Sequence, residues 1–148
     1  MASKINVSSG LTAHGFGLAV HGYDVVSYFT EGEPVVGFAK HSTAHEEATY
    51  RFASESNLKA FEADPSSYLP QFGGFCAFGA AEGGKFDGNP QLWVVADGKL
   101  YLTVNEEVQA LWREDPAAFI DIADHNWPKI ADKATGELNP EVPPKKLA

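Results

Sequence analysis

Two segments of this 148-residue chain match each other without a gap, and the match constrains the fold more than any other feature. The first segment, residues 50–68, reads YRFASESNLKAFEADPSSY, and the second, residues 101–119, reads YLTVNEEVQALWREDPAAF. Each begins with a strand-like run, passes a Ser or Asn suited to a helix N-cap, and has Glu in the first helical turn. Apolar residues then recur at helical spacing until Asp-Pro, which ends a helix. The match predicts one strand–helix unit used twice.

A β-hairpin is expected in front of each predicted helix. The run LWVVADGKLYLTV places Asp97-Gly98 between alternating apolar residues, which is a typical two-residue turn. In the first unit, GFAKHSTAHEEATYRFA predicts a longer loop around Ala44–Glu47. Upstream, Asp24 can accept hydrogen bonds from the N–H groups of a short helix that runs from Val25 to about Thr30. The predicted fold class is therefore α+β: two β-hairpin–helix units packed on one core, with a short N-terminal helix and an extended C-terminal strap.

Length and composition fit one folded domain. A chain of this size can bury a core without disulfide bonds or a structural metal, and a hydrophobic content of 44% is that of a globular protein. Residues 1–16 are rich in Gly and Ser and predict an irregular N-terminal arm. Residues 17–130 predict a single domain. Residues 131–148 contain three prolines and no apolar period, so an extended or disordered tail is expected there.

The charge of the chain excludes several partners. The net charge is -9 and only 11 Lys and Arg are present, so neither nucleic acid nor an anionic membrane surface is an expected partner. No apolar run approaches the roughly 20 residues of a membrane-spanning helix. No signal peptide is visible, which predicts a soluble cytoplasmic protein, or a periplasmic or secreted one if a leader was removed. The single cysteine cannot form an intrachain disulfide.

Four blocks of the sequence resemble the long form of the YHS-domain family. They are GYDVVSYF (22–29), YRFASESNLKAFEADPSSYLPQFGGFCAFGAA (50–81), DGKLYLTVN (97–105) and HNWPKI (125–130). The resemblance covers roughly residues 18–130. It implies a small α+β domain that is often metal-associated and has no established catalytic role.

The short YHS domains of copper-transporting ATPases bind metal through thiolates, and their pattern can be laid on this chain. Their three cysteines fall on Ser27, Ala53 and Asn57. The soft-metal ligands of the short domains are therefore absent, because Ala has no donor and neutral Ser and Asn are poor ligands for a soft metal. The remaining pattern is retained at Asp24, Tyr50, Phe52, Ser54, Phe61, Asp64, Pro65 and Tyr68.

Cys76 is the first candidate for chemistry. It follows Gly73 and Gly74 in QFGGFCA, where glycine permits a tight turn or a close backbone approach. Long-form YHS proteins resemble this chain in keeping one cysteine in this block. A free cysteine also behaves as a small buried hydrophobe, so packing is the competing interpretation. Without a cationic neighbour or a helix N-terminus, the thiol would be unreactive.

Two further residues could complete a metal site with Cys76. His21 directly precedes the first family block, and Asp24 lies within it. A His, Asp and Cys set suits a borderline metal such as Zn²⁺, Cu²⁺ or Ni²⁺. The alternatives are that Asp24 is only an N-cap and that His21 is an ordinary surface histidine. His41 and His45 lie four residues apart in an expected loop, and His125 is interpreted as structural.

Three functions follow from these observations. The first is a metal-binding or metal-handling protein for copper or zinc, with Cys76, His21 and Asp24 as ligands. The second is a non-metal module that binds a small ligand or another chain through an aromatic-lined pocket. The third is a thiol enzyme or redox sensor at Cys76. Nucleotide-binding and hydrolase motifs are absent from the sequence, and no catalytic residue is predicted.

Overall fold

The computed structural model describes residues 4–8, 17–134 and 138, and its fold is α+β, as predicted. The described residues form two compact units. We call Val7–Pro70 together with Val95–Leu100 the N-terminal unit. The C-terminal unit contains Lys4–Asn6, Gln71–Val94 and the described residues from Tyr101 onward. The single domain expected over residues 17–130 stays a prediction.

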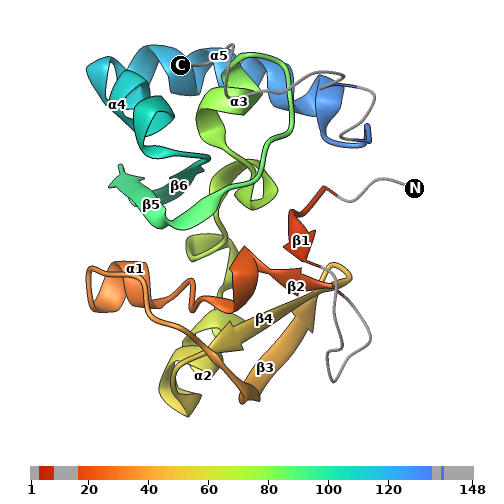
Figure 1. Ribbon diagram of the computed structural model, residues 1–148. Helices are drawn as coiled ribbons and strands as arrows, with labels where there is room; N and C mark the ends of the chain where they lie inside the picture. Colours follow the sequence, from red (N-terminus) through yellow and green to blue (C-terminus); the bar gives the residue numbers. More distant parts are fainter. Residues whose placement is uncertain (1–3, 9–16, 135–137, 139–148) are drawn as a thin grey trace. The chain divides into compact units, whose positions relative to one another are not determined.

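The N-terminal unit is built on a four-stranded sheet with strand order β1-β2-β4-β3 (Figure 1). Strand β2 is antiparallel to β1 and parallel to β4, and β4 is antiparallel to β3. The register of β3 on β4 shifts between Phe38 and Ser42, so residues 39–41 form a bulge. The strands are β1 (Val7–Ser8), β2 (Leu18–Ala19), β3 (Phe38–His45) and β4 (Ala48–Phe52).

Helix α2 (Glu55–Ala63) provides the core of this unit through Phe61. The Phe61 ring centroid lies 5.1 Å from those of both Tyr50 and Phe52 on β4. All three side chains are almost fully buried, because alternate residues of a strand share one face and this face is covered by the helix. The short helix α1 (Ser27–Thr30) precedes the sheet strands β3 and β4.

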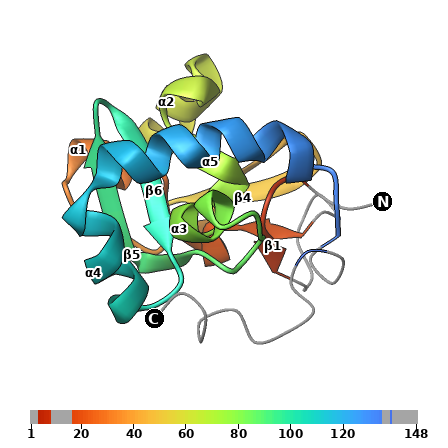
Figure 2. The same cartoon turned by 90° about the horizontal axis from the view of Figure 1, so that it is seen from above.

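The C-terminal unit combines three helices with most of a two-stranded sheet. The sheet consists of β5 (Asn89–Ala96) and β6 (Lys99–Thr103), and the helices are α3 (Ala77–Ala81), α4 (Glu106–Glu114) and α5 (Pro116–Ile130). Helix α5 crosses α3, as the second view shows (Figure 2). Asn126 of α5 donates to the carbonyl oxygens of Ala80 and Ala81 at 3.2 and 3.0 Å, so it caps the end of α3.

Trp112 is the central side chain of this core. It is fully buried, and its ring centroid lies 5.5 Å from that of Tyr101 and 5.9 Å from that of Phe119. These aromatic residues, which could have lined a ligand pocket, therefore pack against one another. The indole Nε1 has no acceptor among the described residues.

The N-terminal segment of the chain belongs to the C-terminal unit. The Asn6 N–H donates to the carbonyl oxygen of Gly73 at 2.8 Å. A Cβ on Gly73 would lie 1.8 Å from the carbonyl oxygen of Lys4, and φ of Gly73 is +65°. Only glycine is compatible with both the space and the dihedral angle. Gly73 of the QFGGFCA block thus makes room for the incoming backbone.

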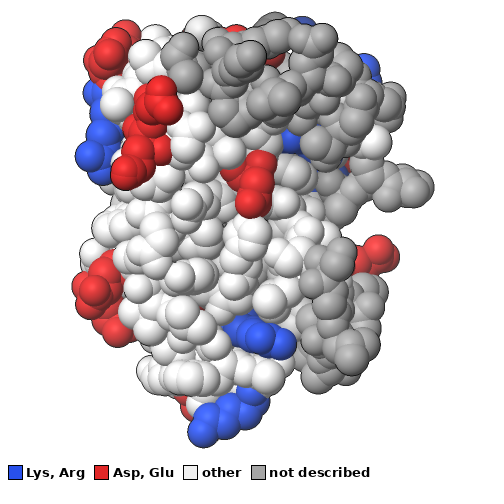
Figure 3. Space-filling view, viewed as in Figure 1, with Lys and Arg blue, Asp and Glu red and all other residues white. Residues whose placement is uncertain are grey.

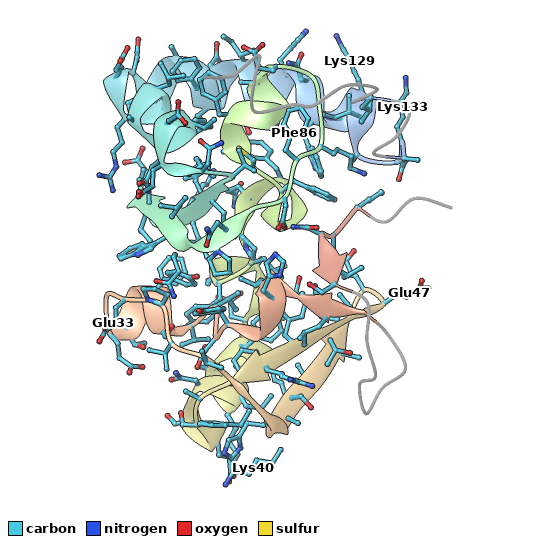
Figure 4. All side chains as sticks on the ribbon, in the orientation of Figure 1. Glu33, Lys40, Glu47, Phe86, Lys129 and Lys133 are labelled. Carbon is cyan, nitrogen blue, oxygen red and sulfur yellow. The ribbon has the colours of Figure 1, made fainter. Side chains whose placement is uncertain are left out.

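The first hairpin corrects one prediction. Strand β3 runs to His45, and Glu46-Glu47 alone connects it to β4, whereas a longer loop around Ala44–Glu47 was expected. His41 and His45 are consequently strand residues. Glu46 and Glu47 have φ of 48° and 65°, which are angles that a two-residue hairpin turn requires and that Glu rarely adopts. Glu47 lies at the outer end of this hairpin (Figure 4).

Helix α5 was not predicted. The second Asp-Pro pair was interpreted as a helix end, yet Asp115 also starts the next helix by accepting a hydrogen bond from the Ala118 N–H at 3.3 Å. Pro116 occupies the first helical position, where its missing N–H costs nothing. Beyond residue 134 the predicted tail lies almost wholly outside the described residues. Among the described residues, no helix combines the length and apolar character needed to cross a membrane.

Candidate functional site

Asp24 is the centre of a buried polar cluster in the N-terminal unit. Its side chain is fully buried and accepts four hydrogen bonds. Oδ1 accepts from the main-chain N–H groups of Val26 at 2.8 Å and Ser27 at 3.2 Å. Oδ2 accepts from the Ala53 N–H at 2.8 Å and from Nδ2 of Asn57 at 2.7 Å. The two oxygens of a carboxylate offer about four acceptor positions, so these donors use them all.

A left-handed turn brings Asp24 into this position. Val20, His21 and Gly22 have φ of 52°, 49° and 82°, and the first of them is a β-branched residue for which this region is unfavourable. The Asp24 N–H then donates to the carbonyl oxygen of Val35 at 2.8 Å. Backbone strain of about 1–3 kcal/mol per such residue persists only where the surroundings impose it. The hydrogen bonds to the Asp24 side chain and main chain supply that constraint.

The positions that the family resemblance relates to thiolates converge on Asp24. Ser27, Ala53 and Asn57 each donate to its carboxylate, through two main-chain amides and one side-chain amide. The Ser27 hydroxyl, also fully buried, donates to the main-chain oxygen of Asp24 at 2.7 Å. Residues from α1, the end of β4 and α2 thus meet at one point.

The carboxylate also acts on its surroundings. Burial raises the pKa of Tyr28, and Tyr23 and the negative charge of Asp24 raise it further. A buried anion near a phenol disfavours a second negative charge. Tyr28 therefore remains a neutral packing residue and does not serve as a base.

Cys76 belongs to the C-terminal unit and is fully buried. It is the N-cap of α3, where its sulfur accepts from the Gly79 N–H at 3.4 Å. The main-chain N–H groups of Val104 and Phe78 also point to the sulfur. Burial nevertheless raises the pKa of the thiol to about 11. The three amides lower the pKa by less than burial raises it, and the Asp87 carboxylate raises it slightly further. The thiol is protonated at neutral pH, whereas nucleophilic and metal-binding cysteines require the thiolate.

His21 lies on the exposed side of the left-handed turn. Its Nδ1 is 3.1 Å from the hydroxyl oxygen of Ser8 on β1. The predicted ligands are thus distributed over the two units: His21 and Asp24 in the N-terminal unit, Cys76 in the C-terminal unit. No three His, Cys, Asp or Glu side chains of the described residues come together in a group that could hold a metal ion. The metal site at Cys76, His21 and Asp24 stays a prediction.

Lys85 is a buried cation that no sequence signal indicated. Its exposed fraction is 1%, and Nζ donates to the carbonyl oxygens of Ala131 at 2.7 Å and Lys133 at 2.9 Å. The ammonium also lies 4.9 Å from the ring centroid of Phe75 and 5.7 Å from that of Trp127. Burial lowers its pKa, which the Asp132 carboxylate opposes. Lys85 thus neutralises the carbonyl-rich end of α5.

Two further histidines, His45 and His125, have local partners. His45 contacts the rings of Tyr50 and Phe61, and its Nε2 lies 3.1 Å from a carboxylate oxygen of Glu46. Nε2 of His125 lies 3.2 Å from Nζ of Lys129, one helical turn away on α5. His14 lies outside the described residues. These contacts of His45 and His125 are thus ring packing and local polar contacts.

The comparisons with known proteins add no relative to this picture. No protein-family model matches the chain, and neither the curated proteins nor the solved structures include a match.

Proposed function

We propose that this chain is a non-catalytic binding module of the YHS type that acts through its surface, and that its buried acceptors Asp24 and Cys76 hold the fold together. One observation carries the proposal: all four acceptor positions of the Asp24 carboxylate are used by donors of the protein itself. Ser27, Ala53 and Asn57, which the YHS resemblance aligns with the thiolates of the short domains, each donate to it. A metal at this carboxylate would have to displace hydrogen bonds that are buried and costly to break.

The thiol does not favour a catalytic or redox role. Cys76 is fully buried, its pKa is raised to about 11, and its sulfur is a hydrogen-bond acceptor for α3. Reactive cysteines lie in partly exposed, electropositive surroundings that lower the pKa. The burial of Cys76 and its raised pKa therefore both argue against a reactive thiol.

A surface on β3 supports the binding role. Val36 and Phe38 are 54% and 53% exposed, the highest values among the large apolar side chains of the described residues. Phe38 is the first residue of β3, an outer strand of its sheet, and Val36 lies two residues before it. An outer strand with exposed apolar side chains suits an extended segment of another protein, which adds as a further strand. Lys and Arg form no continuous patch on the visible face (Figure 3), so apolar and main-chain contacts would dominate.

A metal titration separates this proposal from the metal-handling function. Purified protein is titrated with Zn²⁺ and with Cu⁺, and bound metal per chain is measured by elemental analysis after dialysis. We expect well below one ion per chain. One ion per chain that is lost in Cys76→Ala, His21→Ala and Asp24→Asn, but kept in the surface control His125→Ala, would instead establish the site predicted from the sequence.

A peptide-selection experiment tests the surface directly. A displayed library of random peptides is selected against the immobilised full-length chain, and the affinities of enriched peptides are measured. We expect Phe38→Asp to weaken these peptides at least tenfold. The control Ile122→Asp changes another exposed apolar residue, on α5, and should leave affinity unchanged. Failure to enrich any peptide, or equal affinity for wild type and Phe38→Asp, contradicts binding at β3.

A further inference from the structure

The internal match seen in the sequence is far more extensive in the structure. Three successive elements have identical lengths and a constant separation of 51 residues. These pairs are β3 (Phe38–His45) with β5 (Asn89–Ala96), β4 (Ala48–Phe52) with β6 (Lys99–Thr103), and α2 (Glu55–Ala63) with α4 (Glu106–Glu114). The sequence match covered only the last part of this series, from Tyr50 and Tyr101 onward.

The connections between these elements correspond as well. The turn Glu46-Glu47 has φ of 48° and 65°, and Asp97-Gly98 has φ of 52° and 73°. Asp64 ends α2 with φ of -157° and ψ of 74°, and Asp115 ends α4 with φ of -157° and ψ of 73°. The helix starts are equivalent too, since Ser54 and Asn105 each accept from the amide three residues later.

The correspondence continues upstream, where the two sequences have few identical residues and the separation is 52 instead of 51 residues. The turn Val20-His21-Gly22 has φ of 52°, 49° and 82°, and Phe72-Gly73-Gly74 has φ of 57°, 65° and 85°. Three consecutive left-handed residues are rare, so a second turn of the same kind at the corresponding place is not a chance likeness. Each turn is followed by an aromatic residue and then by Asp24 or Cys76.

A long-range main-chain contact is repeated within each unit. The Asp24 N–H donates to the Val35 oxygen at 2.8 Å, and the Cys76 N–H donates to the Phe86 oxygen at 2.7 Å. The extra residue of the second separation is therefore absorbed between these partners, before the strands begin. Phe86 lies beside α3 (Figure 4).

Two glycines fit against corresponding strand residues in the same way. A Cβ on Gly37 would lie 2.7 Å from Cβ of Arg51, and a Cβ on Gly88 would lie 3.0 Å from Cβ of Leu102. Both glycines are therefore needed for close backbone approach at equivalent places.

The acceptors at the two centres receive the same donors. The Asp24 carboxylate accepts from the amides of Val26, Ser27 and Ala53. The Cys76 sulfur is approached by the amides of Phe78, Gly79 and Val104, which are their structural counterparts. We propose that residues 20–68 and 72–119 are two copies of one structural unit, each folded around a buried acceptor in a cradle of three main-chain amides. In the second copy Cys76 takes the place of Asp24.

The fourth donor explains why the two acceptors differ. In the first copy Nδ2 of Asn57 completes the set around Asp24, whereas its counterpart Val108 is apolar and fully buried. A carboxylate in the second cradle would keep an unsatisfied acceptor position, which is costly in the interior. A neutral thiol needs no fourth donor. This inference does not rest on the proposed function. It explains why the first cradle holds the polar pair Asp24 and Asn57, while the second holds Cys76 and Val108.

A double-mutant cycle at the second cradle tests the proposal. The four proteins are wild type, Cys76→Asp, Val108→Asn and the double variant, and the urea midpoint is measured at pH 7. We expect Val108→Asn to lower the midpoint in the Cys76 background, because it buries an amide without an acceptor. In the Cys76→Asp background the same change should raise the midpoint, because it restores the arrangement of Asp24 and Asn57. An equal decrease in both backgrounds overturns the proposal.

A second cycle decides the matter if Cys76→Asp does not fold in either background. It uses the first copy, with wild type, Asp24→Cys, Asn57→Val and the double variant. Asn57→Val should lower the urea midpoint in the Asp24 background, because the buried carboxylate loses a donor. In the Asp24→Cys background the same change should raise the midpoint, because it reproduces the pair Cys76 and Val108. A decrease of equal size in both backgrounds contradicts the correspondence.

Discussion

At the scale of single residues, the same arrangement of three main-chain amides surrounds a carboxylate at Asp24 and a thiol at Cys76. Three amides around Asp24 and a side-chain donor stabilise a carboxylate, while three amides around Cys76 support a protonated thiol. The amides alone do not lower the thiol pKa below its usual range, because desolvation outweighs them. The identity of the fourth residue, Asn57 or Val108, decides which acceptor fits.

The raised pKa of Cys76 predicts a specific loss of stability in alkali. The unfolded thiol ionises near pH 9, while the folded thiol keeps its proton up to about pH 11. The folded state binds more protons in that window, so its stability is intact below pH 9 and falls as pH rises to 11. A thiol pKa that rises this far on folding corresponds to at most about 3 kcal/mol of the free energy of unfolding.

The measurement is the urea midpoint of wild type and Cys76→Ala between pH 8 and pH 11. The wild-type midpoint should fall more steeply, while the contributions of Tyr28 and Tyr50, whose pKa values burial also raises, cancel in the difference. Parallel curves would contradict the assignment. A thiol reagent should label the native protein only after urea is added.

At the scale of elements, the first hairpin turn is the weakest match between residue and conformation. Glu46 and Glu47 are held at positive φ, where non-glycine residues lose roughly 1–2 kcal/mol each. The second copy meets the same geometry with Asp97-Gly98, a sequence that favours this turn.

Replacing Glu46-Glu47 by Asn-Gly should therefore stabilise the protein by about 1 kcal/mol. Thermal unfolding would detect an increase of a few degrees. The contact of Glu46 with His45 is lost, and because Nε2 of His45 is itself buried, this loss offsets part of the gain. The control is the same exchange at Asp97-Gly98, where almost no gain is expected. A decrease at the first turn would show that the left-handed pair is not strained.

The sequence predicted the elements whose local signals agree with the fold. The helices after Tyr50 and Tyr101 carry N-caps, spaced apolar residues and Asp-Pro ends, and both were predicted correctly. Asp24 was predicted as a helix-start acceptor, but its bonds to Ala53 and Asn57 come from distant parts of the chain. The turn at Glu46-Glu47 was missed because its residues do not favour positive φ, and tertiary packing overrides that preference.

At the scale of the whole molecule, Lys85 connects the loop after α3 to the segment that follows α5 within the C-terminal unit. Its ammonium group is buried and donates to carbonyl oxygens that follow α5, at Ala131 and Lys133. Both acceptors of the Lys85 ammonium group therefore lie outside the two copies. Lys133 marks that end of the helix in the view with side chains (Figure 4).

A chain that stops at Ile130 should be less stable than one that stops at Ala134 by about 2–4 kcal/mol, because a buried ammonium loses two acceptors. Lys85→Met should recover part of the loss in the shorter chain and should destabilise the longer one. Both effects can be measured by urea unfolding. If Lys85→Met changes the two chains equally, the carbonyl contacts are not what the cation contributes.

The hydrogen bond from Asn6 to Gly73 has a consequence for synthesis. Lys4 to Asn6 leave the ribosome before the rest of the described chain, yet they belong to the unit made last. The Asn6 N–H cannot form its hydrogen bond until the segment around Gly73 has emerged. The N-terminal unit can form most of its sheet during translation, whereas the C-terminal unit is completed only when both Lys4–Asn6 and the segment from Gln71 onward are available.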